Sequence, residues 1–501
     1  MIRRTAAIWV FACVVSAAHA QESLLRVVVA HTPPSLGLPF TANGSPSSYY
    51  WHALFDTLTE WSTAGDLQPA LAVSWQQRDP LTWDFKLRPD VVFSDGTPFD
   101  ADAVAATITW LRTTVRGQAT LWGREVATID EAIAEDAQTV VFKTTRPDPL
   151  LPNRLTGVLI VPAAAFEDVD AFAQSPVGTG SFAFETWRDS RGNGILRARP
   201  DAWRPVRFQT MVMVPAPDAT ARLQAVVTGL GDLGVPVPPE LVIDMDTAGV
   251  SVIATNLPAV EIFTVRTVGN PDSPVNDVRV RRAMNYAVNK QPMLRLAGPG
   301  VSVLGQAAPS YVHGHNPDVP PYPYDPDRAR ALLADAGYGT GLSLTMTVNA
   351  SGSLIGLLAQ LVAQDLAAVG IDLELRPITG TQWLQSYTLA NWDTDLFDLN
   401  WNSAPLMDAS RPLEIGSCLR ARPFFCDPAI VPVLEQAQVE LDADKRLDLL
   451  HRAQSMIHAA APGIFLFDFP IYAVSGPALA EVPFRLTVPA YDKILFRQSA
   501  K

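Results

Sequence analysis

The sequence is poor in cysteine, in histidine and in charged residues, and its basic residues are outnumbered by acidic ones. It has 3 Cys and 7 His in 501 residues, and 38 Lys+Arg against 51 Asp+Glu give a formal net charge of −13. This acidic balance argues against nucleic acid and anionic membranes as partners. With 48% hydrophobic and only 18% charged residues, the chain can fill more than one core, which excludes a disordered protein.

The motifs of the common enzyme classes are also missing. The sequence contains no HExxH, GxSxG or Walker A motif. A GxGxxG match at 229–234 follows a predicted helix at 219–227 instead of a strand, and the proline-rich stretch at 235–239 takes the place of the helix that a dinucleotide site needs. His313 and His315 lie on a loop without a third ligand at helical spacing. We therefore predict no cofactor, no metal site and no catalytic residues.

Long apolar runs are absent, and the short one near the N-terminus has the features of a signal peptide. Two arginines precede a mostly apolar stretch at 6–18, and Ala18-His19-Ala20 provides the small residues of a cleavage site. We predict a signal peptide at 1–20 and a periplasmic location. Lipidation at Cys13 is the alternative, and the poor lipobox before it disfavours that alternative. Loss of the two arginines would change the formal charge from −13 to −15.

Cleavage would also remove one of the cysteines. Cys418 and Cys426 would remain, eight positions apart in the sequence. An even pair of cysteines in an exported protein indicates one disulfide that closes a small loop. Two free thiols are the alternative. A metal site is not expected, because the pair has no histidine nearby.

The spacing of the apolar residues indicates an α/β protein. Residues 81–88 alternate between apolar and polar side chains, which is typical of a half-buried strand. Asp100 is placed to cap a helix, and Asp325 followed by Pro326 starts another, which Gly337 ends. No low-complexity linker divides the chain, so we expect α/β domains that are joined without a flexible tether.

Several sequence blocks, in order along most of the chain, resemble those of a known family. The most specific block is 91–99, which ends in Ser94-Asp95-Gly96-Thr97-Pro98-Phe99. On these blocks the sequence resembles the extracellular solute-binding proteins of ABC transporters, family 5, the dipeptide, oligopeptide and nickel-binding type. The other blocks are 55–58, 67–75, 83–88, 176–180, 231–233, 277–283 and 324–338.

The resemblance implies an α/β fold of the two-lobed periplasmic binding protein type (type II), with an extra subdomain in the first lobe. We expect the core of lobe 1 at 21–65, 178–270 and 480–501, the extra subdomain at 66–177 and lobe 2 at 271–479. In this family the lobes close over a solute, and the closed form docks on the membrane subunits of a permease. The implied protein is a monomer that captures a peptide or a peptide-like small solute.

The resemblance also indicates which residues contact the solute. Peptide-binding members have a Trp near residue 400 that is followed by an Asp, and this Asp pairs with the amino group of the peptide. Trp401 matches the Trp, but Ala404 occupies the position of the Asp. We expect the solute to contact aromatic and polar side chains from both lobes, namely Trp401, Asn402, Asp408, Trp383, Tyr387, Tyr49, Tyr50 and Trp51.

Two other functions remain open at this point. A secreted hydrolase could use the same scaffold, because catalytic residues can lie far apart in a sequence. A receptor could instead report the bound solute to a membrane sensor. Intact recovery of the ligand would argue against the hydrolase, and restored uptake would argue against the receptor.

Overall fold

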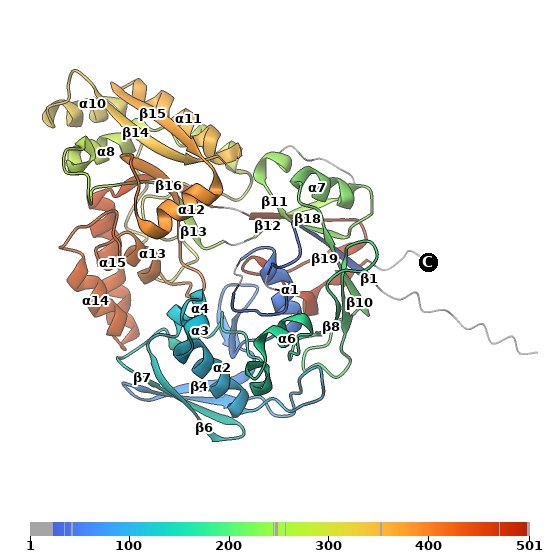
Figure 1. Cartoon of the computed structure of the whole chain (residues 1–501). Helices are drawn as coiled ribbons and strands as arrows, with labels where there is room; N and C mark the ends of the chain where they lie inside the picture. Colours follow the sequence, from blue (N-terminus) through green and yellow to red (C-terminus); the bar gives the residue numbers. More distant parts are fainter. Residues whose placement is uncertain are drawn as a thin grey trace, which may run out of the picture.

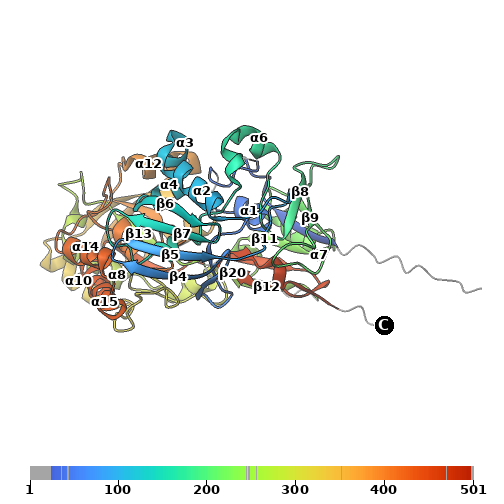
Figure 2. The same cartoon turned by 90° about the horizontal axis from the view of Figure 1, so that it is seen from below.

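The computed structural model describes residues 24–34, 36–41, 44–243, 245, 249–255, 257–350, 353–469 and 471–497. The predicted signal peptide lies outside these residues. Figure 1 shows three parts, each built around one larger sheet, and Figure 2 shows that lobe 2 and lobe 1 lie at opposite ends of the molecule. We call the part around the seven-stranded sheet lobe 1, the part around the five-stranded sheet lobe 2, and the four-stranded sheet with its helices the subdomain.

The sheet of lobe 1 is mixed. Strand β1 pairs in parallel with β10 on one side and with β11 on the other, while the outer strands pair antiparallel. In sheet order the strands are β12 (Ser251–Thr255), β18 (Ile471–Ser475), β11 (Leu233–Val237), β1 (Leu24–Val29), β10 (Thr210–Pro215), β9 (Gly194–Ala198) and β8 (Phe182–Thr186). The helices of this lobe are α1 (Ser47–Leu54), α6 (Val169–Gln174) and α7 (Ala219–Val227).

In the sheet of lobe 2, strand β13 pairs antiparallel with β16 on one side and with the edge strand β17 on the other, while β14 pairs in parallel with β15 and β16. In sheet order the strands are β15 (Ile371–Ile378), β14 (Leu342–Asn349), β16 (Leu396–Asn402), β13 (Ala259–Val265) and β17 (Gly463–Asp468). Its helices are α8 (Val278–Ala287), α9 (Gln291–Ala297), α10 (Pro326–Asp335), α11 (Ser353–Ala367), α12 (Gly380–Leu389), α13 (Ser410–Ile415), α14 (Val431–Val439) and α15 (Ala443–Ala460).

The subdomain is an antiparallel sheet that packs against helix α2. The Asp100 side chain accepts a hydrogen bond from the backbone N–H of Ala103, which confirms the predicted cap of this helix. The strands are β4 (Ala72–Asp79), β5 (Thr82–Leu87), β7 (Thr139–Thr144) and β6 (Ile129–Asp136), and the helices are α2 (Ala101–Thr113), α3 (Val115–Gln118), α4 (Leu121–Glu125) and α5 (Leu151–Arg154). Short hairpins elsewhere are formed by β2 (Thr59–Trp61) with β3 (Leu67–Pro69), β19 (Leu479–Glu481) with β22 (Leu495–Phe496), and β20 (Phe484–Arg485) with β21 (Val488–Pro489).

The chain passes between the two large sheets twice. It leaves the seven-stranded sheet after Thr255 and enters the five-stranded sheet at Ala259, and it returns between Asp468 and Ile471. Strand β13 therefore belongs to the lobe 2 sheet although the expected limit at residue 270 placed it in lobe 1. Strand β18 belongs to the lobe 1 sheet although the expected limit at 479 placed it in lobe 2. Strand pairing over long sequence distances decides these positions, and the sequence blocks do not record it.

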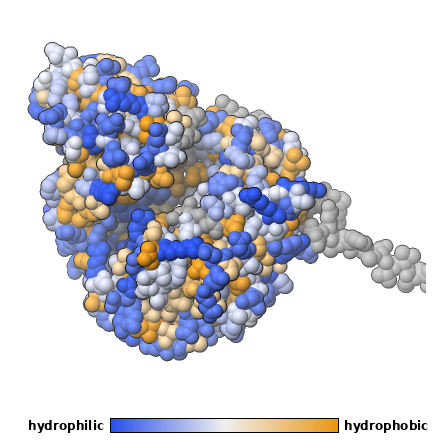
Figure 3. Space-filling model, in the orientation of Figure 1, coloured by the Kyte–Doolittle hydropathy of each residue, from blue (hydrophilic) through white to orange (hydrophobic). Residues whose placement is uncertain are grey.

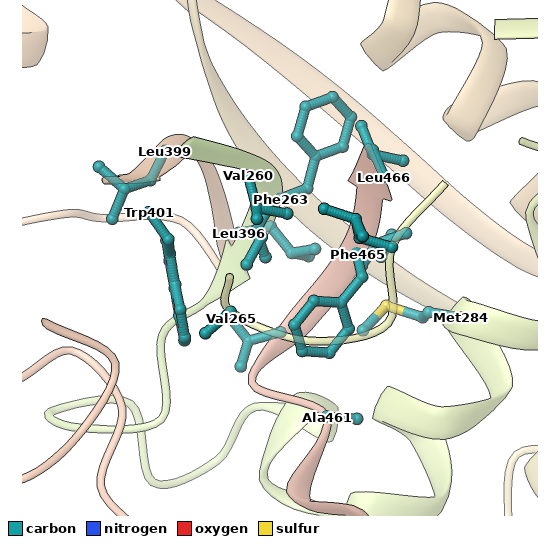
Figure 4. Packing of buried hydrophobic residues seen from close by; sticks show 14 of the residues in the cluster. Val260, Phe263, Val265, Met284, Leu396, Leu399, Trp401, Ala461, Phe465 and Leu466 are labelled. Carbon is teal, nitrogen blue, oxygen red and sulfur yellow. The ribbon is translucent and has the colours of Figure 1, made fainter. Parts of the chain in front are cut away.

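Each lobe has its own buried core. One cluster of buried apolar residues fills lobe 2, and another spans lobe 1 and the subdomain. Trp401 lies in the lobe 2 cluster beside Leu399, Val260 and Val265 (Figure 4). The predicted disulfide between Cys418 and Cys426 is present in this lobe. Among the described residues, no helix is both long and apolar enough to span a membrane.

Candidate functional site

The surface is hollowed between lobe 2 and the rest of the molecule (Figure 3). A cavity of about 210 Å³, which we call the central cavity, lies between lobe 1 and the loop after β16. The loop contributes Ala404 and Pro405, so residues from both lobes line the cavity. The lining from the other side includes Ser48, His52, Glu60, Trp61, Trp122, Thr156, Arg204, Arg485, Tyr491 and Asp492.

The loop 404–406 is tied to the opposite wall by hydrogen bonds to its carbonyl groups. The indole N–H of Trp61 donates to the Pro405 carbonyl at 2.9 Å, and the Asn153 amide donates to the Leu406 carbonyl at 2.8 Å. The Thr156 hydroxyl reaches the Pro405 carbonyl at 3.4 Å. These contacts join lobe 2 to the hairpin of β2 and β3 and to the subdomain.

The charges in the central cavity compensate one another. The Arg204 guanidinium pairs with Asp56 and with Glu60, and the Arg485 guanidinium pairs with Asp492 at 2.7 Å. Asp56 is buried and also accepts hydrogen bonds from Thr179 and Trp203. Burial opposes ionisation of Asp56, but the charge of Arg204 and these hydrogen bonds outweigh it and lower its pKa. The site is therefore polar but carries little uncompensated charge.

His52 adds a neutral polar group to the cavity. Burial and the nearby Arg204 lower the pKa of His52 to about 4, so the imidazole is uncharged at neutral pH. An uncharged imidazole can donate one hydrogen bond and accept another. Together with the rings of Trp61 and Trp122, it gives a cavity with apolar walls and a few polar groups, as is typical of small-molecule sites.

Trp401 does not line the central cavity; it lies in the core of lobe 2. Its side chain is completely buried, and its indole N–H donates to the Thr264 hydroxyl at 3.1 Å. The ring packs so closely on Gly416 that a Cβ atom there would lie 2.0 Å from the ring. Trp401 thus supports the strand that leads to the loop. Its contact with a solute stays a prediction.

Asn402 and Asp408 fix the two ends of the loop. The Asn402 side chain accepts a hydrogen bond from the Ala404 backbone N–H at 2.7 Å. Asp408 is fully buried and forms two hydrogen bonds with Arg446, at 2.7 and 2.8 Å. Burial disfavours the charged form of Asp408, but the hydrogen bonds and charge of Arg446 outweigh it and lower its pKa. Both residues position the loop, and direct contact with a solute stays a prediction for them.

The predicted aromatic residues of lobe 1 lie on the buried side of α1. Tyr49, Tyr50 and Trp51 are buried, whereas Ser48 and His52 of the same helix line the central cavity. Residues four apart lie on one face of a helix, so the cavity face of α1 is the one that carries positions 48 and 52. Solute contact by the three aromatic residues stays a prediction.

Trp383 and Tyr387 stack on each other along α12, with ring centroids 5.4 Å apart. The Trp383 indole N–H donates to the Asp398 carbonyl at 3.2 Å. Tyr387 lines a second cavity of about 480 Å³, between the subdomain and lobe 2, which we call the arginine cavity. Leu406 also lines it, so the loop 404–406 borders both cavities. The two aromatic residues therefore lie beside the arginine cavity and not in the central one.

The charged residues of the central cavity were not found from the sequence. Glu60, Arg204, Arg485 and Asp492 are far apart along the chain, and no local motif marks them. Among the described residues no group of three or more potential metal ligands occurs, and His315 hydrogen-bonds the Ala308 carbonyl.

Comparison with known proteins identifies the family. The sequence profile described as bacterial extracellular solute-binding proteins, family 5, matches residues 66–418, which is more than half of the chain. The chain belongs to this family. The resemblance noted from the sequence blocks is thereby confirmed.

Curated relatives of this family 5 protein include two bacterial binding proteins. The "Glutathione-binding protein GsiB" of Pectobacterium atrosepticum is 25% identical over 450 residues, with 85% of each chain covered. The "Probable di/tripeptide-binding protein 5" of Pseudomonas aeruginosa is 26% identical over 449 residues, covering 81% of this chain and 83% of the relative.

A solved structure shows the same fold. The ABC transporter-associated periplasmic binding protein DppA of Helicobacter pylori, in complex with the peptide STSA, matches with a TM-score of 0.77 and 21% identity, covering 95% of this chain and 99% of that one. The predicted α/β, two-lobed periplasmic binding protein fold is therefore confirmed.

Proposed function

We propose that this protein is the periplasmic solute-binding component of an ABC importer, and that it captures a peptide or peptide-like solute between its lobes. The observation that carries the proposal is the loop 404–406 of lobe 2, which lines the central cavity opposite α1 of lobe 1 and is held there by hydrogen bonds from Trp61 and Asn153. The names of the two curated relatives support the solute class, since they bind glutathione and di- or tripeptides.

In this proposal the bound solute changes the protein by favouring closure of the two lobes. A solute in the central cavity contacts both walls only in the closed form, so it binds this form more tightly and shifts the population toward it. The membrane subunits of the permease then receive the closed form. The charges of the central cavity compensate one another, which favours a solute with little net charge at the part that enters this cavity.

A screen of peptides tests the proposal. Glutathione and a set of di- and tripeptides are added to the purified full-length protein, and the melting temperature and small-angle scattering are recorded. A bound peptide at 100 times its Kd adds about 2.7 kcal/mol to the free energy of unfolding and gives a more compact particle. A peptide that shifts neither readout at any concentration contradicts binding of that peptide, and failure of the whole set contradicts the proposed solute class.

The same material separates import from the other functions. Peptide that is recovered intact after long incubation supports a binding protein, whereas cleaved peptide supports a hydrolase. Restored peptide uptake in cells that lack their own binding protein supports an importer component. Periplasmic fractionation with N-terminal sequencing tests the predicted cleavage before residue 21, and gel filtration tests the proposed monomer.

A further inference from the structure

The arginine cavity carries more positive than negative charge, in a protein whose net charge is −13. It has a volume of about 480 Å³ and lies between the subdomain and lobe 2. The subdomain contributes Arg124, Arg146 and Arg154, and lobe 2 contributes Arg411 and Arg420. The carboxylates in the lining are Glu125 and Glu414, so the arginines outnumber them by five to two. Five guanidinium groups that face one cavity from both sides repel one another, so their arrangement is unfavourable unless negative groups offset this repulsion.

Two of the five arginines are paired within the protein. Arg154 pairs with Asp148 at 2.8 Å and with Glu125 at 3.3 Å, and Arg411 pairs with the same glutamate from the other side of the cavity. The side chain of Glu125 is only 9% exposed. This carboxylate therefore already joins the two walls, and its charge is shared between two guanidinium groups.

The other three arginines lack such a partner. Among the described residues, no carboxylate lies within ion-pair distance of Arg124, Arg146 or Arg420. Arg146 donates to the amide oxygen of Gln438 at 3.0 Å. Arg420 donates to the Tyr387 carbonyl at 2.8 Å and lies over the rings of Tyr387 and Phe424. The stacked guanidinium is thus held in place before any ligand arrives.

We propose that the arginine cavity binds an oxyanion, a carboxylate, phosphate or sulfate group, that bridges the subdomain and lobe 2. Guanidinium groups match the planar oxygens of such groups with two parallel hydrogen bonds, and these bonds are stronger than bonds between neutral groups. The proposal does not depend on the peptide class proposed above. An anion that contacts both walls binds the closed form more tightly, so it favours closure together with the solute.

Two sources can supply this group, and they share the same chemistry. The anion can be free in solution, or it can be part of a solute that extends past the loop 404–406. The loop separates the cavities, since Ala404 and Pro405 line the central cavity and Leu406 lines the arginine cavity. A free anion would bind without the solute, whereas a group on the solute would be displaced together with it.

The experiment uses the full-length protein, sodium phosphate and sodium sulfate at constant ionic strength, with chloride as reference. Melting temperature and calorimetric titration are measured for the native protein, for the double variant Arg124→Ala with Arg146→Ala, and for the control Arg188→Ala with Arg191→Ala. The control removes two exposed arginines from the β8–β9 region of lobe 1, outside both cavities. All four arginines are exposed, so both variants are expected to fold.

For a free anion we expect phosphate or sulfate to bind the native protein and the control, and to bind the cavity variant about tenfold or more weakly. For an anionic group on the solute we expect the same loss in the affinity for glutathione, with phosphate as a competitor. Equal behaviour of the cavity variant and the control toward both anions and toward glutathione overturns the proposal. A retained phosphate response with no response to any peptide contradicts only the peptide class.

Discussion

The central cavity and the arginine cavity share the loop 404–406 but differ in whether their arginines are paired with carboxylates. In the central cavity Arg204 and Arg485 are each paired with carboxylates, so the site is polar without excess charge. In the arginine cavity Arg124, Arg146 and Arg420 have no such ion pairs within the described part of the chain. A buried paired charge makes its partner costly to remove, whereas a charge without an ion pair is available to a ligand.

This contrast predicts which arginines the fold needs. Arg204→Ala leaves the buried Asp56 without its cation and leaves Glu60 with Arg485 alone, and we expect it to lower the free energy of unfolding by about 3–5 kcal/mol. The matched change Arg124→Ala removes an exposed arginine and should cost less than about 0.5 kcal/mol. Urea denaturation measures both values. Similar losses in the two variants would contradict the contrast.

The disulfide affects only one of the two cavities directly, because it closes the loop that carries Arg420. Cys418 and Cys426 enclose Arg420 and Ala421, which line the arginine cavity, and no lining residue of the central cavity lies between them. Replacing both cysteines by serine should cost about 2–3 kcal/mol of stability and weaken the phosphate response. Calorimetry of anion binding checks the second effect. Unchanged anion binding in a correctly folded variant would show that the bridge does not position Arg420. Mass spectrometry of the native protein verifies the bridge itself.

Glu261 extends the comparison to a buried carboxyl group that has no cation beside it in the described part of the chain. It lies on β13, 1% exposed, and its Oε1 atom has no hydrogen-bond partner among the described residues. Burial and the neighbouring Asp398 raise the pKa of Glu261, and burial raises the pKa of Asp398 to about 6. The folded state therefore holds protons that the unfolded state releases. The stability that these protons contribute is fully present at a pH below the pKa values of the two carboxyl groups in the unfolded chain. It is lost as the pH rises through their pKa values in the folded protein.

We expect the contribution of Glu261 to native stability to fall as the pH rises above about 4, and Glu261→Gln to remove this part of the pH dependence. At pH 8 the variant should be more stable than the native protein by about 1–3 kcal/mol, because it removes a buried carboxyl group that must either take up a proton on folding or carry a charge without a cation. Denaturation at pH 5 and pH 8 measures the difference. The control Glu131→Gln changes an exposed residue that pairs with Lys143, and it should leave the pH dependence unchanged. A destabilised Glu261→Gln at pH 8 would contradict the prediction.

The smallest expected effect concerns the contact that closes the central cavity. Trp61→Phe keeps an aromatic wall but removes the N–H that donates to the Pro405 carbonyl. We expect about 1 kcal/mol less favourable solute binding, or about a fivefold higher Kd, and a smaller loss of anion affinity, because Trp61 does not line the arginine cavity and acts on the anion only through closure. Calorimetric titration of glutathione and of phosphate gives both numbers. An equal loss in both titrations would contradict a direct role of Trp61 in the central cavity alone.

Local features were predictable from neighbouring residues. The strand expected at 81–88 is β5 (Thr82–Leu87), the helix expected at 219–227 is α7, and Asp325 caps α10 as expected. Each depends on side chains within a few positions, through alternation, periodicity or a capping carboxylate. The GxGxxG match was correctly set aside, since Gly229–Gly234 runs from the end of α7 into β11.

The site residues were harder to predict from the sequence, because burial and charge pairing depend on the whole fold. The resemblance singled out Trp401 and Asp408, which the structure places in the core of lobe 2 and in an ion pair with Arg446. The residues that do line the central cavity, such as His52 and Arg204, had no sequence signal. Arg204 and Glu60 are 144 positions apart, so only the folded chain brings them together.

The sequence by itself determined the family, the α/β class, the local helices and strands, and the cysteines that pair, because each of these is encoded by residue order or by residues close together. Three properties follow only from the tertiary structure: that β13 joins the sheet of lobe 2 and β18 the sheet of lobe 1, which face of α1 lines the central cavity, and which arginines have no ion pair among the described residues. These properties depend on contacts between segments far apart in the chain, and such contacts leave no periodic or local pattern in the sequence.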